Sequence, residues 1–362
     1  MQAFKIKEKK MIGMKKAVII IVIFPLVVAV VTNVWLFVIL LIIYISFGIL
    51  SFFMLNKLIR HTNWWNNQFI YTSQFVSNQG YREDLHRNYE IANVGSNPAR
   101  FAFHYDDVLG ENWSTGTQGL DMDLEILRYY HSYLREGAYV LLPIVPFSSV
   151  SGYLEKETPS KLYLSKFYKI LDGLQRNCNP KFNGMSRFMR YPLLYEWKAL
   201  RFLIDDVERD RRLEITDQPM SLMDMEKDAL LFINGWKKEF NIKNLDGLLP
   251  EHLVKGRDKS VKMMSDLIYF LQERGYKPVI ISPPMSESLS AYFNKDVKDA
   301  YIYSFVEALK ELNILYLDYT SDDEFARNEY YFNALFMNLR GRKLFTRRVL
   351  SDLGLINKLR NI

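Results

Sequence analysis

An uncharged, strongly apolar run near the N-terminus constrains the fold of this chain most. Residues 17–55 contain no Asp, Glu, Lys or Arg. As one continuous helix, the run would extend roughly 58 Å, about twice the hydrocarbon thickness of a bilayer. We therefore expect two transmembrane helices, with the break near Thr32 and Asn33, the most polar point. The length of the run, with no small-residue cleavage site followed by polar chain, argues against a cleaved signal peptide.

The positive charge of the chain is concentrated beside this run. The formal net charge is +6, and residues 1–16 carry six lysines and a single glutamate. Lys57 and Arg60 add two more positive charges after the run, so the remainder of the chain is close to neutral. A basic face for nucleic acid is not expected, because the charge belongs to the flanks of the membrane segment.

The orientation of the membrane segment has two solutions. The N-terminal lysines place residues 1–16 in the cytoplasm by the positive-inside rule. A two-helix hairpin would then return Lys57, Arg60 and the large domain to the cytoplasm. A single crossing, with a tilted or re-entrant first segment, would place the domain outside.

The remaining chain is read as one large domain with connecting segments. Cys178 is the only cysteine, so neither a disulfide nor a zinc site can form within one chain, and no metal or other cofactor is expected. The predicted organisation is a basic tail at 1–16, a membrane segment at 17–55, a juxtamembrane connector at 56–88, a domain at 89–350 with a helical insertion at about 153–260, and a tail at 351–362.

Alternating strand and helix patterns predict a doubly wound parallel sheet. Short apolar runs bounded by turn residues are typical of buried parallel strands, and apolar residues at helical spacing separate them. The predicted strands are 89–94, 138–145, 278–282 and 314–317. The predicted helices are 98–109, 120–136, 260–274 and 297–312. This succession indicates an α/β fold.

The segment Tyr331–Thr346, YFNALFMNLRGRKLFT, carries the most specific motif. It resembles the C-terminal block of SGNH-type esterases and acyltransferases, in which two aromatic residues precede D-x-x-H-L-N-x-x-G and then F-T. Asn338 and Gly341 fit that pattern, as do the later Phe and Thr. Asn333 stands at the position of the family's catalytic aspartate, and Phe336 at that of its histidine.

A turn after the first predicted strand resembles the family's nucleophile turn. The sequence N-V-G-S-N-P aligns Gly95 and Ser96 with the family's Gly-Ser, which puts Asn97 at the nucleophile position. Asparagine cannot attack an ester. A shift of one residue would let Ser96 serve, because a serine at a helix N-terminus lies where backbone N–H groups favour an oxyanion. We interpret Ser96 and Asn97 as a helix cap and a turn.

The following loop resembles the family's oxyanion block. N-W-S-T-G-T-Q-G-L at 112–120 aligns with N-x-S-x-S-G-Q-S-L, and Gln118 and Asp123 are in register. The family's glycine, whose N–H would help to hold an oxyanion, is Thr117 here. Gly116 or Gly119 could take that role after a small shift of the loop.

The other ionisable groups offer no clear replacement for the missing base. His61, His86, His104, His131 and His252 are interpreted as surface or packing residues. The acidic runs Asp205-Asp206 and 322–324 are interpreted as solvated helix ends or loops. The basic group Arg340, Arg342, Arg347 and Arg348 is interpreted as a solvated helix face. The alternative for these arginines is a site for an anionic polymer or a lipid head group.

The family resemblance implies a setting and three hypotheses. It is closest in pattern to the membrane-anchored D-alanyl transfer proteins of teichoic acid modification and to related capsule proteins. Such a family implies a three-layer, flavodoxin-type SGNH-like domain outside the membrane, often beside a multi-spanning membrane acyltransferase. The leading hypothesis is a catalytically degenerate member that binds a cell-envelope glycan, teichoic acid or a partner protein. The alternatives are an active esterase or O-acyltransferase using Ser96, and a structural membrane subunit whose cleft is filled by side chains such as Phe336.

Overall fold

A computed structural model describes residues 34–62, 87–154, 191–195, 197–204 and 219–357 of the chain. The chain divides into two units, Met1–Thr62 with Arg190–Asp206, and Asn63–Met189 with Val207–Ile362. The basic tail and the first of the two expected membrane helices lie outside the described residues.

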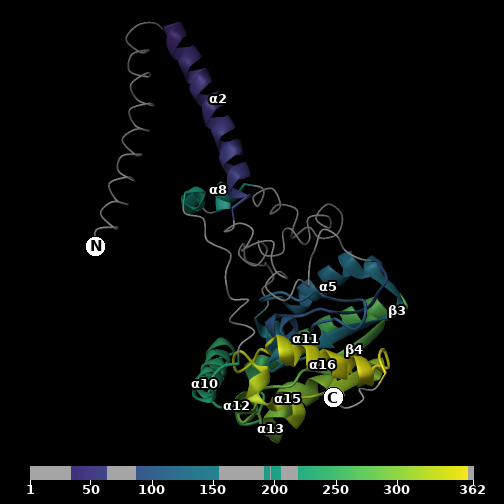
Figure 1. Ribbon diagram of the computed structural model, residues 1–362. Coiled ribbons are helices and arrows are strands. Elements are labelled where there is room, and N and C mark those ends of the chain that lie inside the picture. The colour runs from purple at the N-terminus through teal and green to yellow at the C-terminus, as the bar shows by residue number, and fades with distance from the viewer. Residues whose placement is uncertain (1–33, 63–86, 155–190, 196, 205–218, 358–362) are drawn as a thin grey trace. The chain divides into compact units, whose positions relative to one another are not determined.

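The first unit is built on one long apolar helix, α2 (Val34–Ile59) (Figure 1). Within the described part of the chain, α2 is the one helix long and apolar enough to cross a membrane, and none of its most apolar stretch is buried. Its last turn contains Lys57. The unit also contains α8 (Pro192–Tyr195) and the 3₁₀ helix η5 (Trp197–Leu203), both in contact with α2.

The second unit contains a five-stranded sheet in which every neighbouring pair of strands is parallel. Its strands are β1 (Tyr89–Asn93), β2 (Gly110–Asn112), β3 (Leu134–Pro143), β4 (Lys277–Ser282) and β5 (Leu315–Asp318). Their order is β2-β1-β3-β4-β5, the order of flavodoxin-like doubly wound sheets. The four predicted strands are therefore confirmed, while the short β2 was not predicted.

Helices connect the strands of this unit. Those that follow β1, β2 and β3 are α4 (Asn97–Arg100), α5 (Leu120–Tyr130), η2 (His131–Tyr133), η3 (Ser148–Tyr153), α10 (Leu222–Glu239) and α11 (Glu251–Gln272). Those that follow β4 are α12 (Glu287–Ser290), α13 (Lys295–Lys298), η6 (Asp299–Tyr303), α14 (Ser304–Glu307) and η7 (Lys310–Leu312). Those that follow β5 are α15 (Asp323–Ala326), η8 (Asn328–Tyr330) and α16 (Leu339–Asp352).

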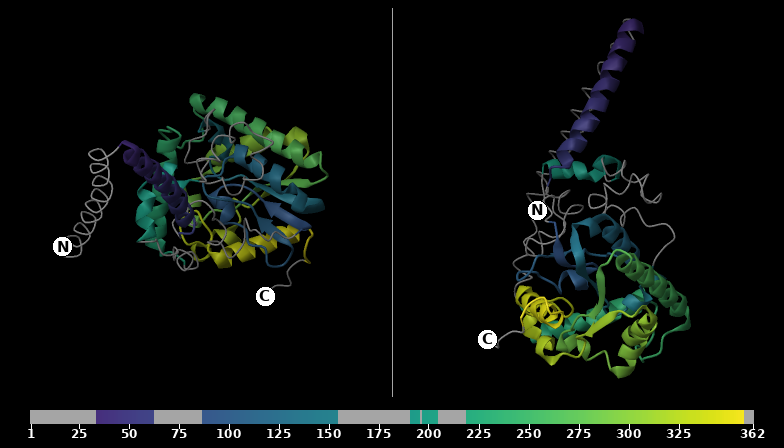
Figure 2. Two further views of the ribbon diagram at one scale, coloured as in Figure 1. Left: turned by 90° about the horizontal axis from the view of Figure 1, so that it is seen from above. Right: turned by 90° about the vertical axis from the view of Figure 1, so that its right-hand side faces the viewer.

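Each face of the sheet has its own apolar core. Successive strand residues point to opposite faces, so Leu141 belongs to one core and Val140 to the other. The Leu141 core is closed by α10 and α16, and the Val140 core by α5 and α11. The left-hand view of Figure 2 shows α11 (green) and α16 (yellow) on opposite sides of the strands. The expected α/β class with a parallel sheet is confirmed.

The helix predicted at 98–109 is wrong, because α4 is a single turn. Its continuation is replaced by side-chain hydrogen bonds from across the sheet edge. The Asn112 Nδ2 donates to the carbonyl oxygens of Arg100 at 3.2 Å and Phe103 at 3.1 Å. These carbonyls are thereby satisfied without further helix, and the chain turns into β2.

Two other boundaries differ from the prediction. Gly137 does not end the helix that begins at Leu120, because that helix stops at Tyr130 and Gly137 lies within β3. Gly137 has a φ of 68°, in a stretch where the register between β1 and β3 shifts, so it accommodates a bulge. Helix α11 begins at Glu251, well inside the predicted insertion, because its apolar face already starts at the buried Leu253.

Candidate functional site

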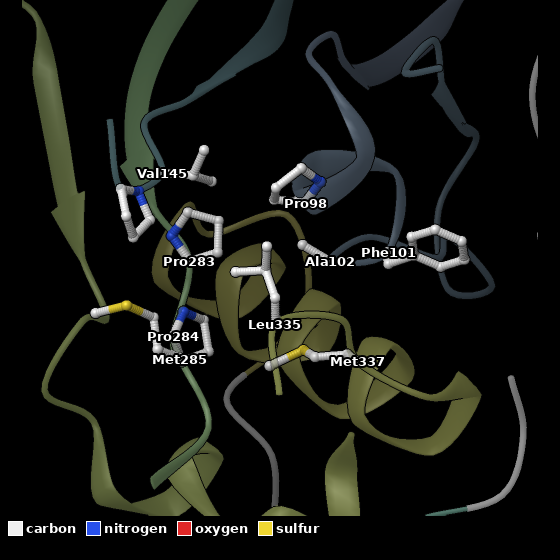
Figure 3. Close-up of a pocket in the computed structure, with 10 residues that line it drawn as sticks. Pro98, Phe101, Ala102, Val145, Pro283, Pro284, Met285, Leu335 and Met337 are labelled. Atoms are coloured by element: carbon white, nitrogen blue, oxygen red, sulfur yellow. The ribbon is translucent and has the colours of Figure 1, made fainter. Parts of the chain in front are cut away.

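The candidate site lies where the carboxyl ends of β1, β3 and β4 meet. After β1 the chain continues to one side of the sheet and after β3 to the other, and such a switch point leaves a crevice in doubly wound folds. The crevice is lined by Pro98, Phe101, Ala102, Val145, Pro146, Pro283, Pro284, Met285, Leu335 and Met337. Figure 3 shows Pro98, Val145, Pro283 and Leu335 grouped around one small space.

The turn after β1 is shaped by a glycine, as the motif requires. Gly95 is buried with a φ of 122°, and a Cβ added there would lie 2.9 Å from the Cβ of Ala99. Ser96 is half-buried and is the N-cap residue of α4, but its side chain makes no capping hydrogen bond. Asn97 is the first residue of that helix. The predicted positions of the cap and turn are therefore correct, without the predicted capping bond.

The loop that resembles the oxyanion block lies against this turn. The backbone N–H of Thr115 donates to the carbonyl oxygen of Gly95 at 3.2 Å. A Cβ added to Gly116 would lie 3.0 Å from the Oδ1 of Asn97, so the amide of Asn97 packs directly on Gly116. The structure thus brings together the two segments that the motifs placed in one site.

Thr117 has a backbone conformation that glycine adopts more readily than other residues. Its φ is 61°, in the left-handed region that glycine adopts without steric cost. A β-branched residue in that region is strained, typically by about 1–2 kcal/mol. Thr117 is exposed. The alignment of this loop with a family pattern that has glycine at the same position is physically reasonable.

Gln118 holds the loop together from inside. Its buried amide accepts from the Thr115 N–H at 2.9 Å and donates to the Trp113 carbonyl at 3.1 Å. The same Nε2 donates to Asp123 Oδ1 at 2.6 Å. Gln118 and Asp123, which are in register with the motif, therefore act on the shape of the loop.

The 331–338 loop is held by its own asparagines. Asn333 Oδ1 accepts from the backbone N–H groups of Leu335 at 3.0 Å and Phe336 at 2.7 Å. Asn338 is the N-cap of α16, where its Oδ1 accepts from the Gly341 N–H at 2.9 Å. An aspartate at position 333 could accept the same two hydrogen bonds. The turn therefore forms without a negative charge at this position.

Phe336 is packed into an aromatic cluster. Its ring stacks on Phe101 with centroids 5.0 Å apart and lies 5.8 Å from the ring of Phe232. Phe332 completes the cluster, 5.0 Å from Phe101. Phe101 directly follows α4, so the residue at the family's histidine position contacts the segment that carries Ser96 and Asn97. These four rings form what we call the phenylalanine cluster.

The crevice itself is apolar and nearly filled. Its cavity volume is about 10 Å³, close to the minimum that a single water needs. None of its described lining residues is ionisable. No proton can be exchanged by the side chains that line this space, and a sugar or acyl group does not fit without movement of the walls.

Two of the described histidines, His104 and His252, have partners away from the crevice. His104 Nε2 lies 2.8 Å from Asp106 Oδ1, and the His104 backbone N–H donates to Thr346 Oγ1 at 2.8 Å. Burial lowers the pKa of His104, an effect that Asp106 opposes and that nearby Arg342 and Lys343 reinforce. His252 Nε2 lies 2.9 Å from the carbonyl oxygen of Phe240. Neither of these histidines lines the crevice.

The charged runs have structural roles where they are described. Asp322 caps α15, and the described residues contain no group of His, Cys, Asp and Glu that could hold a metal. Arg342 is 1% exposed, so the interpretation of this residue as part of a solvated face is wrong. Its guanidinium lies 5.8 Å from the centroid of the Phe101 ring. Asp205-Asp206 lie outside the described residues.

A groove along α10 is a candidate binding feature that the sequence analysis missed. It has a volume of about 380 Å³ and is lined by Asp228, Leu231, Phe232, Gly235, Trp236 and Glu239. Phe232 and Trp236 lie four residues apart, on one face of the helix, with ring centroids 5.7 Å apart. The Asp228 Oδ2 accepts from the Ala334 N–H at 2.9 Å, which links this groove to the 331–338 loop. The i, i+4 aromatic spacing was the available signal.

Comparison of the sequence with protein-family models and with curated proteins finds no match.

Proposed function

We propose that this chain is a membrane-anchored, SGNH-like protein of cell-envelope polysaccharide or teichoic acid modification that binds its target without hydrolysing it. The observation that carries the proposal is the stacking of Phe336 on Phe101 beside a crevice without ionisable lining. Acyl transfer by a serine requires a base that takes its proton and a group that orients that base. Phe336 and Asn333 supply neither.

The backbone features around the crevice support the loss of an esterase or acyltransferase activity, rather than a fold that never had such an activity. Gly95 has the positive φ that the nucleophile turn needs, and Thr117 has the φ of a glycine. Asn338 and Gly341 are joined by the hydrogen bond that makes their three-residue spacing useful. Side chains now fill the space where a substrate would react.

We assign binding to the α10 groove, because the crevice has no room. A volume of about 380 Å³ is within the usual range of ligand pockets, roughly 300–1,000 Å³. Two aromatic rings, tilted by 35° from each other, give an apolar surface. The carboxylates of Asp228 and Glu239 can accept hydrogen bonds from hydroxyl groups. Rings bordered by carboxylates suit a glycan chain. The anchor α2 would keep the groove near an envelope polymer.

Titration of the full-length protein in detergent with a purified, uncharged capsule oligosaccharide tests this proposal. Glu239→Gln should weaken binding, whereas the matched change Glu226→Gln, on an exposed residue of α10 outside the groove, should not. Equal affinity of both variants would refute binding in this groove. Phe232 and Trp236 are less suitable for the test, because both rings also pack against other aromatic side chains.

A fluorophosphonate probe separates this proposal from the active-enzyme alternative. Covalent labelling of Ser96, mapped by peptide mass spectrometry, would reveal an activated serine and overturn the degenerate reading. Ester hydrolysis that disappears in Ser96→Ala would do the same. We expect neither label nor hydrolysis, beside an active SGNH enzyme that reacts under the same conditions.

The filled crevice also favours a second candidate, a structural subunit of a membrane complex. Such a protein would bind no glycan and would accompany a multi-spanning acyltransferase. Loss of that partner on deletion of α2, with no glycan binding by the unmodified chain, would select this candidate.

A further inference from the structure

The end of α2 holds a second segment of the chain, far away in sequence. The backbone N–H of Leu193 donates to Asn56 Oδ1 at 2.9 Å, and Asn56 Nδ2 donates to the Phe52 carbonyl at 2.7 Å. Asn56 is 1% exposed. The ring of Tyr191 lies 5.7 Å from those of both Phe52 and Phe53. Residues 191–204 are therefore fixed to the last turns of the apolar helix, through a buried polar group and aromatic contacts.

The 3₁₀ helix η5 sorts its side chains onto three ridges, because residues three apart eclipse one another. Ala199 and Phe202 form the buried ridge, at 0% and 7% exposure. Trp197 and Leu200 begin an apolar ridge that faces outward, at 69% and 38% exposure. The third ridge, Lys198 with Arg201, is basic and exposed. One ridge anchors the segment, and the other two are exposed to its surroundings.

The apolar exposure continues on both sides of this ridge. Leu194 of α8 is 55% exposed, and Ile204, directly after η5, is 77% exposed. The described residues of this unit carry the basic side chains Lys57, Arg60, Lys198 and Arg201 and no Asp or Glu. Glu196, Asp205 and Asp206 lie outside the described residues. An apolar edge beside a basic edge is the surface that suits the boundary between acyl chains and anionic head groups.

We propose that α8 and η5 form an interfacial segment that lies in the head-group layer of the bilayer crossed by α2. Trp197, Leu200 and Ile204 enter the acyl boundary, and Lys198 and Arg201 contact lipid phosphates. Tryptophan is enriched at this depth because its ring is amphipathic. The occupant is lipid because α2, to which the segment is fixed, is exposed along its apolar length and places this segment at its end.

The inference rests on the membrane anchoring in the proposed function, and is independent of the crevice and the groove. Its consequence is a second attachment of the chain to the membrane. Residues 191–204 return to the bilayer from within the predicted insertion, so the insertion is a membrane-contacting element as well as a part of the globular domain.

Site-directed spin labelling of the full chain in vesicles of phosphatidylcholine and phosphatidylglycerol tests the inference. Cys178 is the only cysteine, so Cys178→Ser gives a clean background. Single labels are placed by Trp197→Cys and Ile204→Cys. Ile45→Cys in α2 provides the lipid reference and Lys238→Cys in α10 the water reference, since both positions are exposed. Collision with oxygen reports lipid contact, and collision with a water-soluble nickel chelate reports solvent contact.

We expect the oxygen-to-nickel ratio at 197 and 204 to be several-fold higher than at 238. Ratios at 197 and 204 equal to that at 238, with 45 in lipid, would overturn the interfacial segment and point to a protein partner for this surface. A water-like ratio at 45 would overturn the segment together with the membrane anchor. The two failures are therefore distinguishable. The purified chain is the only protein present, so lipid contact is measured directly.

Discussion

The ring of Phe336 stacks on the ring of Phe101, with centroids 5.0 Å apart and an angle of 29° between their planes. The contact joins the 331–338 loop to the segment directly after α4. One pair of rings therefore joins these two segments by packing, and the following predictions test what this contact and its neighbours do.

Phe336→Ala should destabilise the protein by about 2 kcal/mol, because a half-buried ring loses its contacts with the other three members of the phenylalanine cluster. The midpoint of thermal unfolding should fall by about 4–8 °C in a domain of this size. Differential scanning fluorimetry of the full chain in detergent measures the shift. Tyr292→Ala, at an exposed ring, is the control and should change the midpoint far less. A similar midpoint for both variants would show that the cluster contributes little.

Thr117→Gly should be more stable than Thr117→Ala by about 1 kcal/mol. Both variants remove the hydroxyl and the β-branch, but alanine keeps the Cβ that is strained at a φ of 61°. The comparison therefore isolates backbone strain, and urea unfolding of the two variants measures it. Equal unfolding midpoints would mean that Thr117 does not adopt this conformation in solution, and would weaken the alignment of the loop.

The triple variant Asn97→Ser, Asn333→Asp, Phe336→His should gain ester hydrolysis if the chain is a degenerate SGNH-like protein. A serine with an oriented base is expected to raise turnover of an activated acetyl ester by about 10–100-fold over the unmodified chain. Spectrophotometric release of nitrophenol measures the gain. The matched control carries Asn97→Ala with the other two changes, and should stay at background. Equal rates for the triple variant and this control would count against the resemblance.

His104 should make stability fall as the pH falls below neutrality. Burial lowers its pKa from the ordinary 6.5, so the unfolded chain takes up a proton before the folded one. The contribution is complete above pH 6.5 and is lost as the pH drops from there towards the lower folded pKa. Three charged groups face His104: Asp106 raises its pKa, and Arg342 and Lys343 lower it, so that the net direction remains downward. Burial raises the pKa of Asp106, but the Lys343 and His104 contacts outweigh it, so that group titrates below 3.8.

Thermal unfolding at about pH 7.5 and about pH 5.5 checks this dependence on the two sides of the unfolded pKa. His104→Gln keeps a polar side chain of similar size and removes the titration. The loss of stability between the two pH values should be smaller in the variant than in the unmodified chain. An identical loss in both would assign the pH dependence to other groups.

The sequence predicted four of the five strands because each of them has a local apolar pattern that is typical of a buried strand. The run 278–281, for example, is apolar at every position, as burial on both faces of a parallel strand requires. The missed β2 is three residues long and contains Glu111, whose carboxylate accepts a hydrogen bond from Tyr89 within the core. A glutamate indicates a loop in a sequence-based prediction, because its partner Tyr89, 22 positions away, is not recognisable from the sequence.

The sequence predicted which residues belong to the candidate site, but not how their side chains pack in three dimensions. The motifs named Gly95, Thr117 and Asn333, and these residues have the backbone conformations or hydrogen bonds that suit their places. The motifs gave no sign that Arg342 is buried, or that Phe232, from the insertion, reaches Phe336. Both depend on packing between residues that lie more than a hundred positions apart in the sequence, Phe232 against Phe336 and Phe101 against Arg342.

The sequence by itself determined the local elements: an apolar helix long enough for a membrane, the parallel strands, and glycine where φ must be positive. These follow from side-chain hydrophobicity, its period and the steric limits of the backbone, which act between near neighbours. Only the tertiary structure decided that Asn97 packs on Gly116, that aromatic rings and proline side chains close the crevice, and that residues 191–204 are fixed to α2. Those outcomes depend on which surfaces meet, because burial and hydrogen-bond satisfaction are properties of the assembled chain.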